Sequence, residues 1–487
     1  MSTANLLLTN IEMRSLINSA VISLGVSFFT LALSFLLGLP LAFFKIPGKR
    51  LLPFLFLIPL LIPPYLHAFS WMHFLMSLGD YKIFGLSSGY AIQLLNSIPG
   101  VIFVLTVAYF PISFFIIYQA VSNFPQQLID AAGQITSPAK VIRRIIIPAI
   151  LPQVLTAATV TFIVTFITFD VPAFLGKNIF VTQIFKSFTF TGEFGRALYL
   201  SSIPVLIIGS IWALLFIILV KDRPFFSFQS LKKKGVFLLE KPPAFIIFFF
   251  YLMVVLCLLS SILPLAVLQV KNILLEKTPF YTASSSGVIA NTLWISVISS
   301  FFIVLLSTFA FLFFYRKMLG RILFLSLLIL PSITFAILFI FLFNRPFLNL
   351  IYTTPIILVI AYSFRFAPLV TELLHSYSQQ INPQYIESGR LLYPISRRML
   401  NMIILPLYTP VLFLAWIFSF WLVATELPIT LLVQPPGFQT IITRLFIVLH
   451  YGAEELMGSM TLALLSVSFF PILVAYFFFR KNLKNDQ

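Results

Sequence analysis

The sequence contains little charge and a single cysteine. Of its 487 residues, 9% are Asp, Glu, Lys or Arg and 60% are hydrophobic, and the mean hydropathy is +1.05. Average soluble chains carry about 25% charged residues, so this composition leaves too little polar surface for a soluble fold. The lone Cys257, inside an apolar run, excludes an intramolecular disulfide and a cysteine-based metal site. The composition therefore predicts an all-α polytopic membrane protein.

Long apolar runs give the number of predicted membrane spans. A bilayer core about 30 Å thick requires roughly 20 apolar residues in a helix. Eleven runs satisfy this requirement, near 16–44, 51–76, 99–122, 145–168, 197–220, 243–269, 288–315, 322–343, 354–376, 403–424 and 456–479. The first twenty residues lack a basic start and a small-residue cleavage site, so no cleavable signal peptide is expected.

The basic residues predict the orientation. There are 31 Lys and Arg against 14 Asp and Glu, a net charge of +17 that in a soluble chain would suggest nucleic acid. If eleven spans alternate, the basic clusters all lie on one side, which the positive-inside rule assigns to the cytoplasm. These clusters are 45–50, 140–144, 221–234, 316–321, 390–398 and 480–484. We expect an external N-terminus, a cytoplasmic C-terminus and no nucleic-acid partner.

The chain also contains an internal repeat. Asn18 corresponds to Asn291, and three further pairs of segments correspond: 57–65 with 327–335, 107–114 with 360–368, and 169–176 with 425–432. The repeat predicts a first half at 1–220 with about five spans, a basic cytoplasmic linker at 221–242, and a second half at 243–487 with about six spans. The span at 243–269 has no counterpart in the first half.

Each half contains one amphipathic segment with an acidic start, a basic middle and a terminal proline. The two are DAAGQITSPAKVIRRIIIP at 130–148 and ESGRLLYPISRRMLNMIILP at 387–406. A short charged helix of this kind cannot enter the bilayer and is suited to docking a soluble partner. The alternative is a pair of ordinary basic loops.

This pattern resembles the coupling-helix motif of ABC importer permeases, in which an acidic residue and Ala-Ala precede a Gly and, nearly twenty residues later, an apolar residue and Pro. Two segments, 124–148 and 381–406, are identified by this resemblance as ATPase-coupling segments. The matching residues are Asp130, Ala131, Ala132 and Pro148 in the first, and Glu387, Gly389 and Pro406 in the second. The first segment is one residue short of the usual spacing. In the second, Ser388 and Gly389 replace both alanines.

A narrower resemblance is found downstream. ELPITLLVQPPGFQTIITRLFIVLHYG at 426–452 is similar to the signature of iron(III)-type ABC permeases, as are LIPPYLHAFSW at 61–71 and FDVPAFLG at 169–176. The resemblance implies a fused type I importer permease in a bacterial inner membrane that imports ferric iron. It also implies two copies of an ABC ATPase and an extracytoplasmic binding protein as partners, besides membrane lipid. Thiamine, phosphonate and polyamine permeases are related alternatives.

The chain contains no ATPase motif of its own. A phosphate-binding loop requires G-x-x-x-x-G-K-[S/T], and the two Gly-Lys pairs, Gly48-Lys49 and Gly176-Lys177, are followed by Arg and Asn. We therefore expect no enzyme activity and no bound cofactor in this chain, with ATP and Mg on a partner ATPase. An ion-coupled secondary transporter is the rival of a different class, because such transporters also use internal repeats and intramembrane acidic residues.

Ionisable residues in or beside the spans are candidates for a pathway or gate. Arg365 serves either as a gate or ion-pair residue, with Glu372 as a possible partner, or as a structural hydrogen-bond donor. Asp170 and Glu426 correspond in the repeat. They either face each other across the pathway or cap the segments that begin near Pro172 and Pro428. The four histidines form no pair at metal-ligand spacing, so no metal site is expected.

Overall fold

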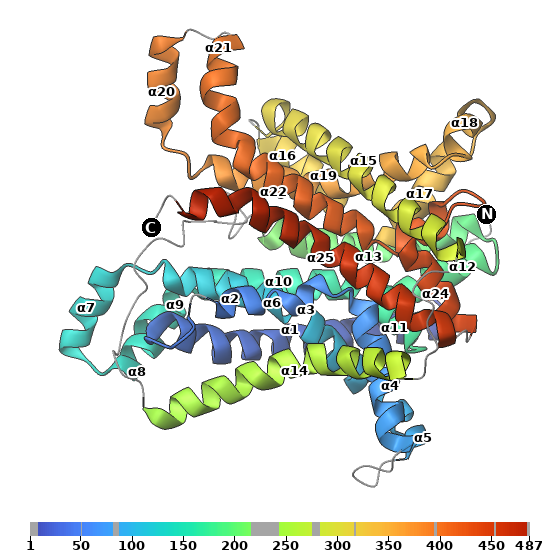
Figure 1. Cartoon of the computed structure of the whole chain (residues 1–487), viewed down its shortest axis with the longest axis horizontal. Helices are drawn as coiled ribbons and strands as arrows, with labels where there is room; N and C mark the ends of the chain where they lie inside the picture. Colours follow the sequence, from blue (N-terminus) through green and yellow to red (C-terminus); the bar gives the residue numbers. More distant parts are fainter. Residues whose placement is uncertain are drawn as a thin grey trace. The chain divides into compact units, whose positions relative to one another are not determined.

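A computed structural model describes residues 8–49, 51–80, 87–215, 243–274, 283–315, 318–393, 397–451 and 454–484. All regular elements in these ranges are helical, as Figure 1 shows. The predicted linker at 221–242 lies outside the described residues.

Seven helices in the described ranges are long and apolar enough to cross a bilayer. They are α1 (Asn10–Phe43), α6 (Ile98–Ser122), α13 (Phe194–Leu215), α14 (Ala244–Leu274), α15 (Ala283–Phe313), α19 (Ile356–Ser378) and α22 (Leu405–Ala424). The chain is therefore a helical multi-pass membrane protein. The count of eleven spans stays a prediction.

Three further predicted spans consist of bent helix pairs. They are α2 (Leu52–Leu55) and α3 (Ile58–Leu61) with α4 (Pro64–Asp80), η3 (Ile142–Ile146) and α9 (Ile147–Ala149) with α10 (Leu151–Ile167), and α16 (Met318–Leu325) and η5 (Ser326–Ile329) with α17 (Ser332–Phe343). The bends are 86°, 58° and 101°. Pro63, Pro152 and Pro331 lie at or beside the breaks. Proline favours a break because it lacks a backbone donor and disfavours helical geometry in the residue before it. The first and third pairs correspond in the repeat.

The remaining elements connect or flank these spans. They are α5 (Ser88–Leu95), α7 (Gln126–Ile135), α8 (Pro138–Val141), α11 (Asp170–Phe174), α12 (Phe180–Thr189), η6 (Pro346–Leu348), α18 (Asn349–Tyr352), α20 (Pro383–Leu392), α21 (Arg397–Met399), η7 (Leu400–Ile404), α23 (Pro428–Val433), α24 (Ile441–Tyr451) and α25 (Glu454–Lys484).

The described helices form two compact units, α1 to α14 and α15 to α25. In the first unit α1 packs along α6 and α10. Its core includes Leu37 and Leu41 of α1 with Phe110 and Phe114 of α6, all fully buried or nearly so. In the second unit α15, α19 and α22 pack together, and Tyr362 is fully buried in that core.

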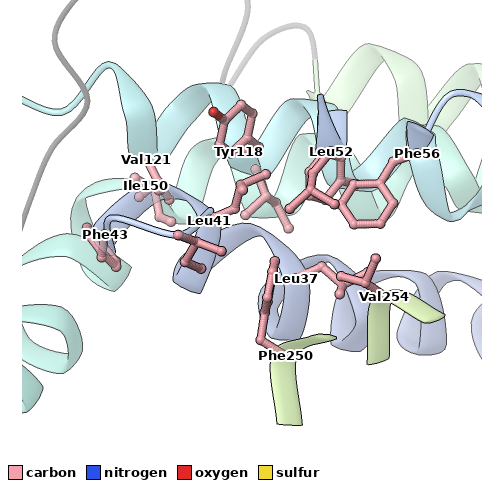
Figure 2. Close-up of a cluster of buried hydrophobic side chains, with 14 of the residues drawn as sticks. Leu37, Leu41, Phe43, Leu52, Phe56, Tyr118, Val121, Ile150, Phe250 and Val254 are labelled. Atoms are coloured by element: carbon pink, nitrogen blue, oxygen red, sulfur yellow. The ribbon is translucent and has the colours of Figure 1, made fainter. Parts of the chain in front are cut away.

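The helix α14 belongs to the first unit. Phe250 and Val254 pack beside Leu37 in its core, as Figure 2 shows. Trp71 Nε1 donates to the carbonyl of Ser260 at 2.9 Å, which joins α14 to α4. The sequence repeat divides the chain at residue 243, whereas the packing places the unmatched span with the helices that precede it.

Candidate functional site

The two predicted coupling segments contain the same elements in the same order. Each begins with a ten-residue helix, α7 or α20, and continues through a short helix into a five-residue π-helix, η3 or η7. Figure 1 shows α7 and α20 as short helices at one end of the spans of their own units. The same order of helix, short helix and π-helix occurs once in each unit, so it arises from the sequence and packing of each segment within its own unit.

The acidic residues lie on exposed faces of these helices. Asp130 is exposed on α7, where its Oδ1 accepts a 2.7 Å hydrogen bond from Gln126 Nε2. Glu387 is exposed at the equivalent position of α20. Both carboxylates are therefore accessible to a partner.

The neighbouring small residues differ between the two helices. Ala131 is exposed, whereas Ala132 packs against the core of the first unit. Gly389 is buried, and a Cβ added there would lie 2.6 Å from Cδ1 of Ile403 in η7. Glycine at position 389 thus allows α20 to approach the π-helix closely.

The π-helices precede the two motif prolines. The amide of Ile147 donates to the carbonyl of Ile142, and the amide of Leu405 donates to the carbonyl of Leu400, so each bond spans five residues. Pro148 and Pro406 follow directly and cannot donate. Such π-helices are rare and frequently mark functional sites.

One additional residue separates α20 from η7, compared with α7 and η3. This residue accounts for the spacing difference between the two motifs. The helix and the π-helix keep their lengths in both segments, and only the connection between them varies.

Large apolar side chains are exposed on both α7 and α20. Leu128 and Ile135 of α7 are 55% and 88% exposed, and Tyr385 and Leu391 of α20 are 64% and 88% exposed. Leu128 and Tyr385 occupy equivalent positions in the two helices. Exposed apolar residues surrounded by charge are typical of protein-interaction surfaces.

The second segment also contains a groove of about 480 Å³ between α20 and the start of α22. Its lining residues are Tyr385, Ser388, Gly389, Met402, Ile403, Pro406 and Leu407. Two motif residues, Gly389 and Pro406, therefore shape this groove.

Arg365 is 6% exposed and binds the break between η5 and α17. Its Nη1 donates to the carbonyls of Leu330 at 2.7 Å and Leu327 at 3.2 Å. These carbonyls lie beside Pro331, where the helical bonding is interrupted. This geometry corresponds to the structural alternative for Arg365, while a gating role stays a prediction.

Glu372, the possible partner of Arg365, pairs with a different arginine. Arg321 Nη2 lies 2.6 Å from Glu372 Oε1, and Arg321 Nε lies 3.3 Å from Oε2. Both residues are buried. Sequence reasoning assigned Arg321 to a basic loop and missed this pair. The corresponding positions of the first half are Leu51 and Gln119, so the sequence signal was an acid and a base appearing together in one half only.

Asp170 and Glu426 lie at the starts of short helices. The carboxylate of Asp170 accepts hydrogen bonds from the amides of Val171 and Tyr65. Glu426 Oε1 accepts from the amide of Ile429 at 3.4 Å. The N-cap residues of the two short helices are Phe169 and Leu427, and neither makes a side-chain cap hydrogen bond, so the capping alternative also stays a prediction. The pathway alternative depends on the placement of the two units relative to each other and stays a prediction.

A repeated pair of hydrogen bonds fixes the segment that follows each of these acids. Asn18 Nδ2 donates to the carbonyl of Asn178, and the amide of Phe180 donates to Ser19 Oγ, at 3.1 and 2.9 Å. In the second unit Asn291 and Thr292 make the same two bonds, to Gln439 and Ile441, at 3.1 and 2.8 Å. We call each pair of bonds a latch. The matched Asn18 and Asn291 of the sequence repeat thus have the same structural role.

Within the described residues, no group of three or more His, Cys, Asp or Glu side chains could hold a metal ion. His67 is fully buried, and its Nε2 lies 2.9 Å from the carbonyl oxygen of Pro59.

Comparison with protein-family models and with curated proteins finds no match for this chain. The family assignment made from the motifs is therefore a proposal.

Proposed function

We propose that this chain is the membrane-spanning permease subunit of an ATP-driven importer of the ABC type. The observation that carries the proposal is the repeated docking segment, an exposed acidic helix followed by a π-helix and a proline, once in each unit. Two equivalent docking segments are suited to two copies of one soluble partner.

Each segment is continuous with a membrane span of its own unit. The π-helix η3 leads into α10, and η7 leads directly into α22. A displacement of η3 or η7 by a partner would therefore act directly on one span of the same unit. In this proposal ATP and Mg bind the partner ATPases, and their closure changes the access of the pathway from one side of the bacterial inner membrane to the other.

The proposed cargo is ferric iron delivered by an extracytoplasmic binding protein. This part rests on the similarity of 426–452, 61–71 and 169–176 to iron(III)-type permeases. Carboxylates at Asp170 and Glu426 would lower the energy of a passing cation. Thiamine, phosphonate and polyamine are the alternative substrates, and uptake with each labelled compound and the cognate binding protein distinguishes them.

The buried Arg321–Glu372 pair is the observation that favours a secondary transporter instead, because paired intramembrane charges are typical of ion-coupled mechanisms. The two functions differ in their energy source. Uptake that continues without any ATPase, and that collapses with the ion gradient, would support the secondary transporter.

The test is the charge reversal Glu387→Lys, with Glu193→Lys as its matched control. Both side chains are exposed, and Glu193 lies outside the docking segments. We expect Glu387→Lys to abolish co-purification of the ATPase or its stimulated hydrolysis while the melting temperature stays unchanged. The control should behave as the unmodified protein. Normal hydrolysis and uptake by Glu387→Lys would remove the docking role and with it the main support for the proposal.

A further inference from the structure

A groove with a volume of about 570 Å³ lies between α1 and α14 in the first unit. It is lined by apolar side chains and is rich in phenylalanine, and its lining includes Leu36, Pro40, Phe245, Phe248 and Phe250. None of these residues belongs to a docking segment or to a latch. The function proposed above therefore makes no use of this groove.

The groove opens onto the surface of the chain. Phe245 and Phe248 are 73% and 71% exposed, although both helices are long and apolar enough to span a bilayer. In a membrane such a surface is covered by hydrocarbon chains. Contact with lipid tails alone provides no strong selectivity, because tails and apolar side chains are equally apolar.

The end of the groove at Pro40 and Phe245 is next to a basic turn. Lys45 and Lys49 follow the end of α1, and Lys45 is exposed. Lys49 Nζ donates to the carbonyl of Ala42 at 3.0 Å. Gly48, with φ of 70°, allows the chain to reverse between them.

This turn is also fixed against α14. Tyr251 Oη donates to the carbonyl of Pro47 at 2.8 Å, and the next residue along the helix toward its start, Phe250, lines the groove. The turn that contains the two lysines is thus held beside the apolar groove by contacts to both helices that form it.

We propose that this groove binds one acyl chain of an anionic phospholipid whose headgroup phosphate contacts Lys45 and Lys49. An apolar groove beside positive charge favours a phospholipid over a free phosphate ion, because a phosphate ion has no acyl chain to occupy the groove. Positive charge at the headgroup level favours an anionic headgroup over a zwitterionic one.

The test uses native mass spectrometry of the full chain in micelles with equimolar phosphatidylglycerol and phosphatidylcholine of identical acyl chains. We expect preferential retention of one phosphatidylglycerol. Lys45→Gln should reduce this retention about fivefold, the equivalent of about 1 kcal/mol for one lysine near the membrane surface. Leu36→Trp, which fills the groove, should remove it.

Two controls separate this site from general effects of charge and apolar area. Lys140→Gln removes an exposed lysine of the first docking segment, and Phe28→Trp enlarges an exposed residue of α1 away from the groove. Both should retain the lipid as the unmodified protein does. Equal retention of the two lipids, or equal loss in Lys45→Gln and Lys140→Gln, would overturn the proposal, as would a groove-filling variant that keeps the lipid.

Discussion

Arg321 and Glu372 form a buried ion pair at positions where the first half has Leu51 and Gln119. Both carboxylate oxygens of Glu372 accept hydrogen bonds from the Arg321 guanidinium, so the buried contact is bidentate. The charges compensate each other, and removal of either one leaves the other buried without compensation. Arg365 solves the same problem differently, because it binds carbonyls that a proline leaves without helical donors.

We predict that Glu372→Leu lowers the free energy of unfolding in mixed micelles by about 3–5 kcal/mol, the cost typical of a broken buried pair. The double variant Arg321→Met with Glu372→Leu should recover most of this loss. Denaturant titration, followed by a probe placed in the second unit, measures the free energy of unfolding of the single and double variants. A single variant that costs less than about 1 kcal/mol would show that the pair is solvated.

Lys49 gives a prediction for pH dependence. Burial lowers the pKa of Lys49 from 10.5 to about 8. The folded state therefore releases this proton at a lower pH than the unfolded state does. Below about pH 8 the lysine is charged in both states, so the cost of burying its charge destabilises the folded state in full. As pH rises from about 8 to 10.5 the unfolded state binds more protons, so stability should rise.

Comparison of Lys49→Met with Lys140→Met tests this expectation through melting temperatures between pH 7 and 10.5. Lys49→Met should flatten the rise, and Lys140→Met, at an exposed site, should leave it unchanged. The same slope in all three proteins would contradict the assignment to Lys49.

At the scale of elements, the helical segments around α7 and α20 were predictable, but the π-helices that follow them were not. The charge pattern and the prolines identified 130–148 and 387–406 from sequence. A π-helix differs from an α-helix by one residue in a hydrogen-bonding register, which leaves no signal in side-chain periodicity. The bends at Pro63 and Pro331 had a visible signal, but hydrophobicity over a window of about 20 residues does not resolve a bent span from a straight one.

Gly133 of α7 and Gly389 of α20 allow a comparative test of packing. A Cβ at Gly133 in α7 would meet nothing within 4 Å, whereas at Gly389 in α20 it would meet Ile403. Gly133→Ala should raise the free energy of unfolding by about 0.5–1 kcal/mol, because helical glycine is costly. The change in the free energy of unfolding caused by Gly389→Ala should be less favourable than that caused by Gly133→Ala, by about 1 kcal/mol or more.

Ile403→Val removes the Cδ1 atom that the new Cβ would meet, so it should restore the stability of Gly389→Ala in the double variant. Thermal unfolding of the four proteins measures the coupling. Equal gains at both glycines would show that α20 does not approach η7 as closely as 2.6 Å implies.

At the scale of the whole molecule, the membrane character followed from composition, but the packing of α14 did not. Its sequence is as apolar as that of the other spans, and nothing local distinguishes a helix that packs with preceding spans from one that packs with following spans. The partners of Phe250 and Trp71 are about 200 residues away along the chain. Such distant contacts are invisible to arguments from periodicity.

The orientation is testable because the only native cysteine, Cys257, is buried. From the basic clusters we predict that Pro436→Cys reacts with an impermeant maleimide added outside intact cells. Gln134→Cys, in the first docking segment, should react only after permeabilisation. Both sites are exposed on the chain, so access depends on the side of the membrane. The reverse labelling would invert the topology and remove the cytoplasmic docking segments.

The placement of α14 has a consequence for biosynthesis. A ribosome that has completed residues 1–220 has made every span of the first sequence half, yet the buried surface around Leu37 still lacks Phe250 and Val254. At about 5–20 residues per second, the translation of 221–274 takes several seconds. During this interval the first unit is incomplete in the membrane, and it closes only when the start of the second half is inserted. Assembly of the first unit is therefore completed only after the linker has been translated. Division of the gene at residue 243 would separate the first unit from α14, its last helix.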